Sequence, residues 1–214
     1  MFRGITVALL TLPASLALAE GRAVALKVGA LGFGAEYTHE LTDRIAVRGG
    51  LYGSKLGVDF EESGIEYEAD VVWDSVVAGI DFHPLKSALR LSAGLIKNDN
   101  ALELVSRPTA PQTINDETYT PAQIGTLEGG VVFDDTARFV GLGWDWSRDK
   151  RLFGMSFDIG LIDQGDPRVV LRGTGTLLGD PSFEQDIDAE AAQLQDDIDA
   201  DVVPFFSVGF QFRF

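Results

Sequence analysis

Charged side chains recur in segments of this sequence that are otherwise apolar. In each segment they share a face with glycine and serine, and the opposite face carries large apolar side chains. Buried charges persist only when they are paired. We therefore expect an internal ion-pair network that plugs a lumen. Its expected members are Glu36, Arg48, Asp81, Arg90, Asp158, Arg172 and Arg213.

The same charges allow a second interpretation. Rings of charged side chains can select ions in a narrow pore. A closed wall of eight strands leaves room mainly for side chains, which favours a plug over a conducting path.

The candidates for catalysis and metal binding are few. The only histidines, His39 and His83, fall in predicted short turns, whereas a lipid-modifying barrel enzyme needs histidine near serine or aspartate at the opposite rim. Asp186, Asp188 and Glu190 resemble the start of a calcium loop, but the glycine and the distal glutamate of that loop are missing. We therefore predict no enzyme, no cofactor and no metal site.

Period-two alternation is the main structural signal of the sequence. In residues 153–161, five large apolar side chains alternate with Gly154, Ser156, Asp158 and Gly160. A soluble β-sandwich or a lipocalin-like barrel, the alternative, would place the bulk inside and many lysines and glutamates outside. Apolar bulk facing outward predicts an all-β transmembrane barrel, antiparallel and up-and-down.

The connections between these segments alternate in length. Residues 38–44, 83–87 and 134–136 are short, whereas 60–69 and 97–123 are longer and more polar. Short periplasmic turns and long outer loops give this pattern. We expect 97–123 to be an exposed loop that could hold one short strand.

The strand count depends on two segments. Nine segments alternate when residues 168–173 are included, but a barrel with both ends in the periplasm needs an even number. The apolar phase changes between Val28 and Leu31, so residues 23–28 are either a separate strand or a segment that does not cross. Eight or ten strands fit, and we predict eight.

One segment has helical spacing. Ile187, Ala191, Leu194 and Ile198 recur at that spacing within residues 184–201, which hold eight acids and no base. We predict a short acidic helix before the last strand, beginning near residues 180–182. Its charge should keep it in water rather than on lipid.

The first residues have the pattern of an export signal. Arg3 precedes an apolar run, and Ala17-Leu18-Ala19 has the small-x-small form that a signal peptidase recognises. We predict a signal peptide at 1–19 and a single barrel domain at 20–214, with a buried N-terminal helix as the alternative. The chain has no cysteine, so its stability must come from the hydrogen-bonded fold itself. Its net charge of −16 argues against nucleic acid as a partner.

The last strand carries a recognisable pattern. Ser207, Gly209, Phe212 and Phe214, with Phe210 on the same apolar face, resemble the terminal β-signal of bacterial outer-membrane proteins. That resemblance implies recognition by the barrel-assembly machinery. The alternative is a terminal strand of a soluble protein.

The body is similar to small proteobacterial outer-membrane barrels of the OmpA/OmpW-like kind, in residues 81–84, 89–95 and 119–123. The resemblance implies a location in the outer membrane of a Gram-negative bacterium, outer-membrane lipids as partners, and a monomer. The acidic helix departs from the simplest OmpA-type barrels. We predict a structural or interaction role, with a transporter of a small or apolar solute and a lipid-modifying enzyme as alternatives.

Aromatic side chains near the strand ends predict belts at the lipid interfaces, with ligand stacking as the alternative. They are Tyr37, Trp73, Phe82, Trp144, Trp146 and Phe153.

Overall fold

The computed structural model describes residues 21–62, 65–146, 148, 152–196 and 201–214. The predicted signal peptide, residues 1–19, lies outside this part of the chain. Within these ranges, no helix combines the length and the apolar character that crossing a membrane would demand.

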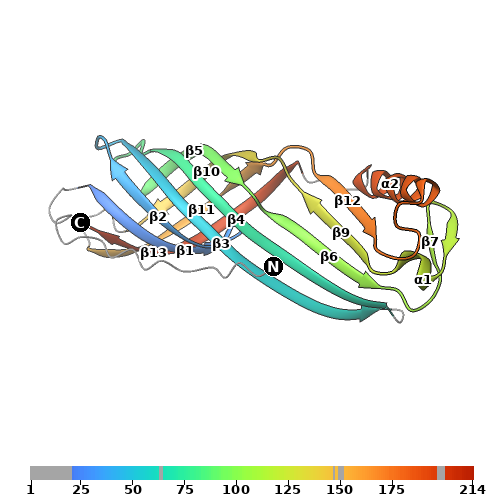
Figure 1. Ribbon diagram of the computed structural model, residues 1–214. Coiled ribbons are helices and arrows are strands. Elements are labelled where there is room, and N and C mark those ends of the chain that lie inside the picture. Colours follow the sequence, from blue (N-terminus) through green and yellow to red (C-terminus); the bar gives the residue numbers. More distant parts are fainter. Residues whose placement is uncertain (1–20, 63–64, 147, 149–151, 197–200) are drawn as a thin grey trace.

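Eight antiparallel strands close into a barrel (Figure 1). They are β1 (Arg22–Gly29), β2 (Gly32–Glu40), β3 (Ile45–Glu62), β4 (Ile65–Phe82), β5 (Leu89–Asn98), β10 (Thr136–Asp145), β11 (Phe153–Asp163) and β13 (Val202–Arg213). Strand β13 pairs with β1, from Arg213 opposite Ala23 to Ser207 opposite Gly29, and this pairing closes the wall. The predicted eight-stranded barrel is confirmed.

The segment near Val28 and Leu31, where the apolar phase changes, forms a pair of strands. The segment 23–28 belongs to β1, and β1 pairs with β2 across a tight connection at Ala30 and Leu31. The apolar phase changes there because the chain reverses direction. Residues 168–173, which brought the count to nine, do form a strand, but it lies outside the barrel.

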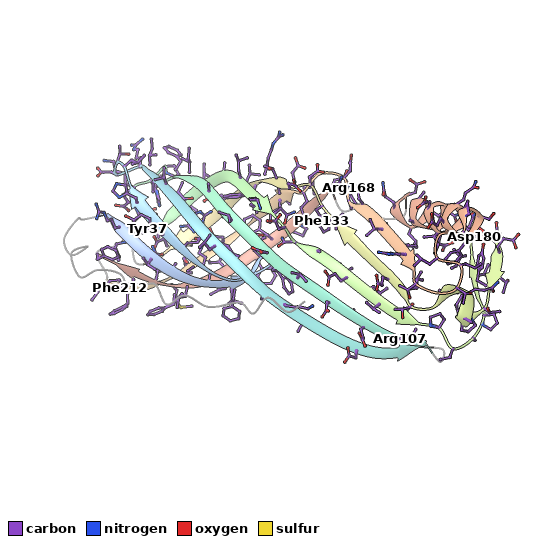
Figure 2. The ribbon with its side chains drawn as sticks, viewed as in Figure 1. Tyr37, Arg107, Phe133, Arg168, Asp180 and Phe212 are labelled. Atoms are coloured by element: carbon purple, nitrogen blue, oxygen red, sulfur yellow. The ribbon has the colours of Figure 1, made fainter. Side chains whose placement is uncertain are left out.

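The two ends of the barrel differ. Arg22, Phe214, Trp146, Leu152 and the connections 41–44 and 83–88 lie at one end, here the terminal end. Tyr37 and Phe212 lie near the terminal end in Figure 2. The other end, the loop end, carries the long connections.

The link at residues 133–135 corrects one prediction. Although short, it leads into the start of β10 opposite Lys97, at the loop end. It therefore does not belong with the turns of the terminal end.

A second sheet continues from the barrel at the loop end (Figure 1). Strands β3 and β4 are 18 residues long, so they extend past their barrel neighbours. There β4 pairs with β6 (Ala101–Arg107), β6 with β9 (Leu127–Val132), and β9 with β12 (Arg168–Gly173). We call this extension, with β3 from Gly53 and β4 up to Asp74, the projecting sheet.

Two helices and a hairpin complete the projecting part. They are α1 (Pro121–Ile124), α2 (Pro181–Asp196), and the hairpin of β7 (Gln112–Ile114) and β8 (Glu117–Tyr119). Asn115 and Asp116 both have positive φ, as a tight hairpin turn requires. Residues 97–123, predicted as a mostly irregular loop, are therefore largely regular, because they pair with one another and with β4.

The predicted acidic helix is α2. It begins at Pro181, where Asp180 caps it by accepting from the N–H groups of Ser182 and Phe183 at 3.0 and 3.2 Å. Its buried side chains are Phe183, Ile187 and Ala191. Phe183 and Ile187 pack with Ile114 and Ile124 in a second core, separate from the barrel interior. The predicted residues 197–200 lie outside the described residues.

The two faces of β3 and β4 exchange character along the strands. Inside the barrel wall, Leu51 and Ile80 point outward and are 61% and 58% exposed, whereas Arg48 and Asp81 point inward and are buried. Beyond Gly53 and Asp74 the outward face carries Lys55, Asp59, Glu68 and Asp70, and the inward face carries Leu56, Val58, Ala69 and Val71.

The aromatic prediction needs one correction. Trp144, Trp146 and Phe153 are about half exposed on the outward face near the terminal end. Trp73 instead shares the inward face, and its indole N–H donates to the carbonyl of Ala30 at 2.8 Å. It braces the β1–β2 connection at the barrel mouth, so it does not belong to an outward belt.

Candidate functional site

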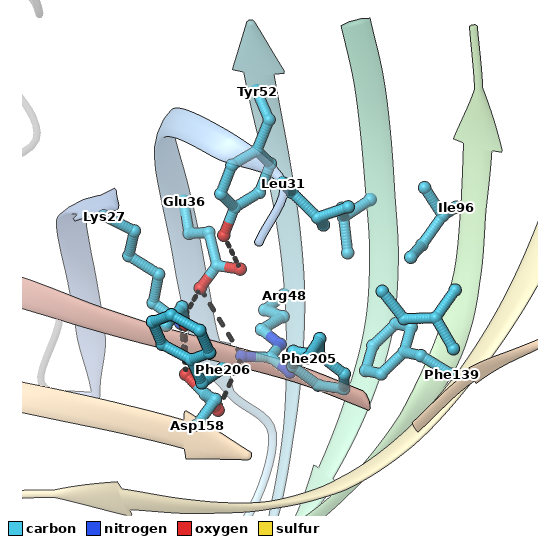
Figure 3. Close-up of a pocket in the computed structure, with 13 residues that line it drawn as sticks. Lys27, Leu31, Glu36, Arg48, Tyr52, Ile96, Phe139, Asp158, Phe205 and Phe206 are labelled. Carbon is cyan, nitrogen blue, oxygen red and sulfur yellow. Dashed lines mark hydrogen bonds and ion pairs between the residues drawn. The ribbon is translucent and has the colours of Figure 1, made fainter. Parts of the chain in front are cut away.

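Six buried charged residues from six strands meet inside the barrel, and Figure 3 shows Lys27, Glu36, Arg48 and Asp158 among them. They form the ion-pair plug: Lys27 (β1), Glu36 (β2), Arg48 (β3), Asp81 (β4), Arg90 (β5) and Asp158 (β11). Each is at most 6% exposed. Alternation along the strands turns these side chains inward, and they comprise three cations and three carboxylates, so the plug is formally neutral.

Asp158 lies at the centre of the plug. One carboxylate oxygen contacts Arg90 Nη2 at 2.5 Å and Arg48 Nη1 at 3.4 Å, and the other contacts Lys27 Nζ at 2.6 Å. The hydroxyl of Ser207 donates to it at 3.3 Å. Every cation of the plug thus touches this carboxylate.

Glu36 connects the plug to Tyr52, which lies on its loop-end side. Its Oε2 contacts Lys27 Nζ at 2.6 Å and Arg48 Nη1 at 3.5 Å, and the hydroxyl of Tyr52 donates to its Oε1 at 2.6 Å. Charge-assisted bonds of this kind are stronger than neutral ones and compensate for the burial of the charges.

Asp81 is held more loosely than the other two carboxylates. Ser92 donates to its Oδ1 at 2.6 Å, but its distances to Arg48 Nε and Arg90 Nη1 are 3.6 and 3.8 Å. The β4–β5 side of the plug is therefore its weaker side.

Glycines make room for the plug. A Cβ atom at Gly209 would lie 2.8 Å from Lys27 Cγ, and one at Gly143 would lie 2.2 Å from Arg90 Nε. Gly209 and Ser207 are also members of the predicted β-signal, so the inward face of β13 serves the plug as well.

An apolar layer covers the plug on the loop-end side. Phe139 and Phe205 meet edge to face at 6.1 Å, and Arg48 lies 5.5 Å from the Phe139 ring centre. The layer consists of Tyr52, Val77, Ile96, Ala137, Phe139, Ile162 and Phe205. Plug and layer leave a cavity of about 30 Å³ for the centres of water-sized molecules, space for roughly two waters.

A second cluster of charged residues lies at the terminal end. Glu40 Oε1 contacts Arg148 Nη1 at 2.6 Å and Arg213 Nη1 at 2.8 Å, and Arg213 Nη2 contacts Asp145 at 2.7 Å. His83 Nε2 lies 3.0 Å from Arg148 Nη1, so it accepts a hydrogen bond in its neutral form. Burial, followed by the Arg148 charge, lowers the pKa of His83 to about 4.

The predicted site residues separate into three groups. Five of them, Glu36, Arg48, Asp81, Arg90 and Asp158, meet in the plug. Arg213 lies in the terminal-end cluster instead.

Arg172 corrects the prediction, because it is exposed on β12 of the projecting sheet. Lys27 was missed, although alternation of Ala23, Ala25 and Lys27 with Val24, Leu26 and Val28 would have identified it once 23–28 was accepted as a strand.

Two of the residues considered for calcium have other contacts. Asp186 accepts from Tyr119 and, at 3.0 Å, from the Asn115 side chain, while Glu190 accepts from the Asn115 N–H at 2.9 Å. They attach the β7–β8 hairpin to α2. In the part of the chain that the structure describes, no three acidic, histidine or cysteine side chains are grouped to hold a metal.

Comparisons with known proteins identify the fold. No protein-family model matches the sequence, and no curated protein does. The solved structure of Acinetobacter baumannii CarO matches with a TM-score of 0.61 at 21% identity, covering 90% of this chain and 97% of CarO. This chain shares the CarO barrel fold. CarO2 of the same organism gives 0.62 at 18% identity, covering 91% and 99%.

A third structure, Ail, the attachment invasion locus protein of Yersinia pestis, matches with a TM-score of 0.41 at 14% identity, covering 91% and 100%. CarO and Ail are outer-membrane barrels.

Proposed function

We propose that this chain is an integral outer-membrane barrel that does not conduct, and that its projecting part is an interaction platform. One observation carries the proposal that the barrel does not conduct. Six charges from six strands neutralise each other inside the wall, with Asp158 in contact with all three cations. A plug of this kind fixes the register of the barrel and blocks its lumen.

The outward surface supports the membrane location. Large apolar side chains cover the outside of the barrel wall, and the outward faces of β3 and β4 become charged beyond Gly53 and Asp74. An apolar band that ends in charged residues is the pattern of a strand that leaves lipid for water.

Neighbouring labels test this orientation. Phe157 is 36% exposed and Asp158 is 3% exposed. Spin labels at the two positions, in protein reconstituted into lipid, should show that only position 157 is accessible to a lipid-soluble relaxant. Access at 158 instead, or migration that boiling does not change in a detergent gel, would remove the membrane barrel from consideration.

Recording from planar bilayers tests the closed lumen. The wild-type protein should give no steady conductance steps. Steady steps would replace the plug with a pore.

A narrow pore is the second candidate, because the Asp81 side of the plug is loose. Its contacts with Arg48 and Arg90 are 3.6 and 3.8 Å, against 2.5 Å between Arg90 and Asp158. If the plug opens, it should open there. Asp81→Asn should then increase the frequency of openings above that of the wild type, whereas a closed barrel stays silent in both.

A lipid-modifying enzyme is the remaining alternative. His83 faces Arg148 rather than a nucleophile. Assays of lipid products from the wild type and from His39→Ala and His83→Ala variants test it, and activity lost on either substitution would support an enzyme.

A further inference from the structure

Strand β3 has an open edge in the projecting sheet. It pairs with β4 along its whole length but with β2 only as far as Tyr52. Among the described residues, no strand pairs with the second edge of β3 beyond that point. We propose that this edge, from Gly53 to Asp59, binds an extended segment of another protein as an added β-strand. The inference rests on the proposed interaction role and names its site.

Hydrogen bonds of Asp74 reveal which main-chain groups are available. The Asp74 N–H donates to the Asn100 side chain at 2.8 Å, and its carbonyl accepts from the Asp99 N–H at 2.9 Å, so both point away from β3. Asp74 lies opposite Gly53, and this pair is therefore a non-hydrogen-bonded pair. The N–H and C=O of Gly53 point away from β4 as well.

Alternation extends this result along the strand. In an antiparallel ladder every second residue points its N–H and C=O to the same side. Lys55, Gly57 and Asp59 must therefore direct their main-chain groups to the open edge, as Gly53 does. The edge offers a regular row of donors and acceptors, which is the requirement for strand addition.

The usual protection of a free edge is weak here. Natural edge strands are blocked by proline, by lysine charge or by a covering element. Residues 53–59 contain no proline, and the charge of Lys55 is already neutralised by Asp70 at 2.8 Å. Helix α2 lies on β12, at the opposite side of the sheet.

The two faces beside the edge specify the chemistry of the added strand. On the inward face, Leu56 and Val58 are 55% and 51% exposed. On the outward face, Asp59 lies opposite Glu68, and Arg107 binds Glu68 at 2.7 Å, so the acidic side chain next to the edge is Asp59. A strand with apolar residues at alternate positions would cover Leu56 and Val58, and a basic residue between them would face Asp59.

A second copy of this chain does not fit the edge. Two copies in one membrane hold their β3 strands in the same direction and present the same edge to each other. Antiparallel pairing of identical edges requires opposite directions, and parallel pairing joins unlike edges. The occupant is therefore a segment of a different molecule.

A substitution pair isolates the main chain of Lys55. Lys55→Pro removes an N–H that points to the open edge of β3 and leaves the β3–β4 ladder intact. Lys55→Ala removes the side chain alone. The probe is a fluorescent peptide of roughly eight residues, an ordinary strand length, in which valine and lysine alternate. Binding to the full chain in detergent is followed by fluorescence anisotropy. We expect Lys55→Ala to bind as the wild type does, and Lys55→Pro to bind about tenfold more weakly.

Two controls make the result decisive. A peptide of the same composition with its valines and lysines in separate blocks should not bind, and neither should one methylated at alternate amides. Because the chain has no cysteine, Asp59→Cys should form a disulfide with a cysteine-bearing alternating peptide, whereas Val170→Cys on β12 should not.

Equal binding by Lys55→Pro and Lys55→Ala, equal binding of the control peptides, or a dimer of the chain cross-linked through position 59 would overturn the proposal. The gel shift on boiling, measured on the same preparations, reports the barrel separately. A lost shift counts against the proposed function, and a retained shift without peptide binding counts against the edge alone.

Discussion

The barrel and the projecting sheet share strands β3 and β4, but the charged and apolar faces of these strands are reversed between the two regions. In the barrel, β3 and β4 direct Arg48 and Asp81 inward and Leu51 and Ile80 outward. In the projecting sheet, the same strands direct Leu56 and Val71 inward and Lys55 and Asp70 outward. The period of two is uninterrupted, so the surroundings of each face, and not the strand itself, set the residue type.

The interiors differ in what stabilises them. The barrel interior combines the plug with an apolar layer, whereas the core under α2 consists of Ile114, Ile124, Phe183 and Ile187. Charges are tolerated in the barrel because partners from several strands reach one point. The core under α2 relies on burial of apolar surface against one sheet edge.

Removing the central carboxylate is the most severe test of the plug. Asp158→Asn leaves Arg90 buried without its main partner and takes one of two carboxylates from Lys27, and we expect a loss of about 3–5 kcal/mol in the free energy of unfolding. Urea unfolding in lipid vesicles measures it. Asp166→Asn, at an exposed aspartate, is the control and should change stability by less than about 0.5 kcal/mol. Equal stability of the two variants would mean that the plug does not stabilise the fold.

Truncating Phe183 tests whether the two cores are independent. Phe183 is 2% exposed, and Phe183→Ala should destabilise the projecting part by about 3–5 kcal/mol. Amide hydrogen exchange should speed up in α2 and β12 and remain unchanged in the plug strands. Faster exchange at Asp158 as well would show one cooperative unit instead of two.

Arginine substitutions on the outward faces of the barrel wall and of the projecting sheet test whether the first face is apolar in its surroundings and the second is in water. Ile80 and Val170 are 58% and 52% exposed, on the barrel wall and on the projecting sheet. Ile80→Arg should cost about 2–4 kcal/mol in lipid vesicles because it faces hydrocarbon. Val170→Arg should cost less than about 0.5 kcal/mol because it faces water. Similar costs at both positions would contradict the boundary near Gly53.

Acid should weaken the terminal end through His83. The pKa of His83 is lowered to about 4, below its ordinary value of 6.5, so between these values the unfolded chain binds a proton that the folded chain does not. The stability contributed by neutral His83 is present above pH 6.5 and is lost as the pH falls towards 4. We expect wild type to lose about 1–2 kcal/mol more than His83→Gln across this window. Parallel curves for the two proteins would refute the linkage.

The sequence predicted the parts of this architecture that depend on neighbouring residues. Alternation along 153–161 identified the strand and its faces, and the spacing of Ile187 and Ala191 identified α2. The same alternation selected five members of the plug, since a charged residue on a small-residue face has only the lumen to enter.

Other features depended on which strands become neighbours. Lys27 contacts Asp158, 131 residues away, and no local pattern connects them. The alternation of Arg172 resembles that of a wall residue, yet β12 pairs with β9 rather than with a barrel strand. Trp73 resembles a belt residue until its bond with Ala30 places it at the barrel mouth.

The sequence by itself therefore determined the strands of the barrel wall and their inward and outward faces, because a period of two is a local property of the backbone. Only the tertiary structure decided that 168–173 leaves the wall for the projecting sheet and that the edge of β3 stays open. Pairing between strands far apart along the chain depends on which partner remains available once the barrel has closed, and a single strand does not carry that information.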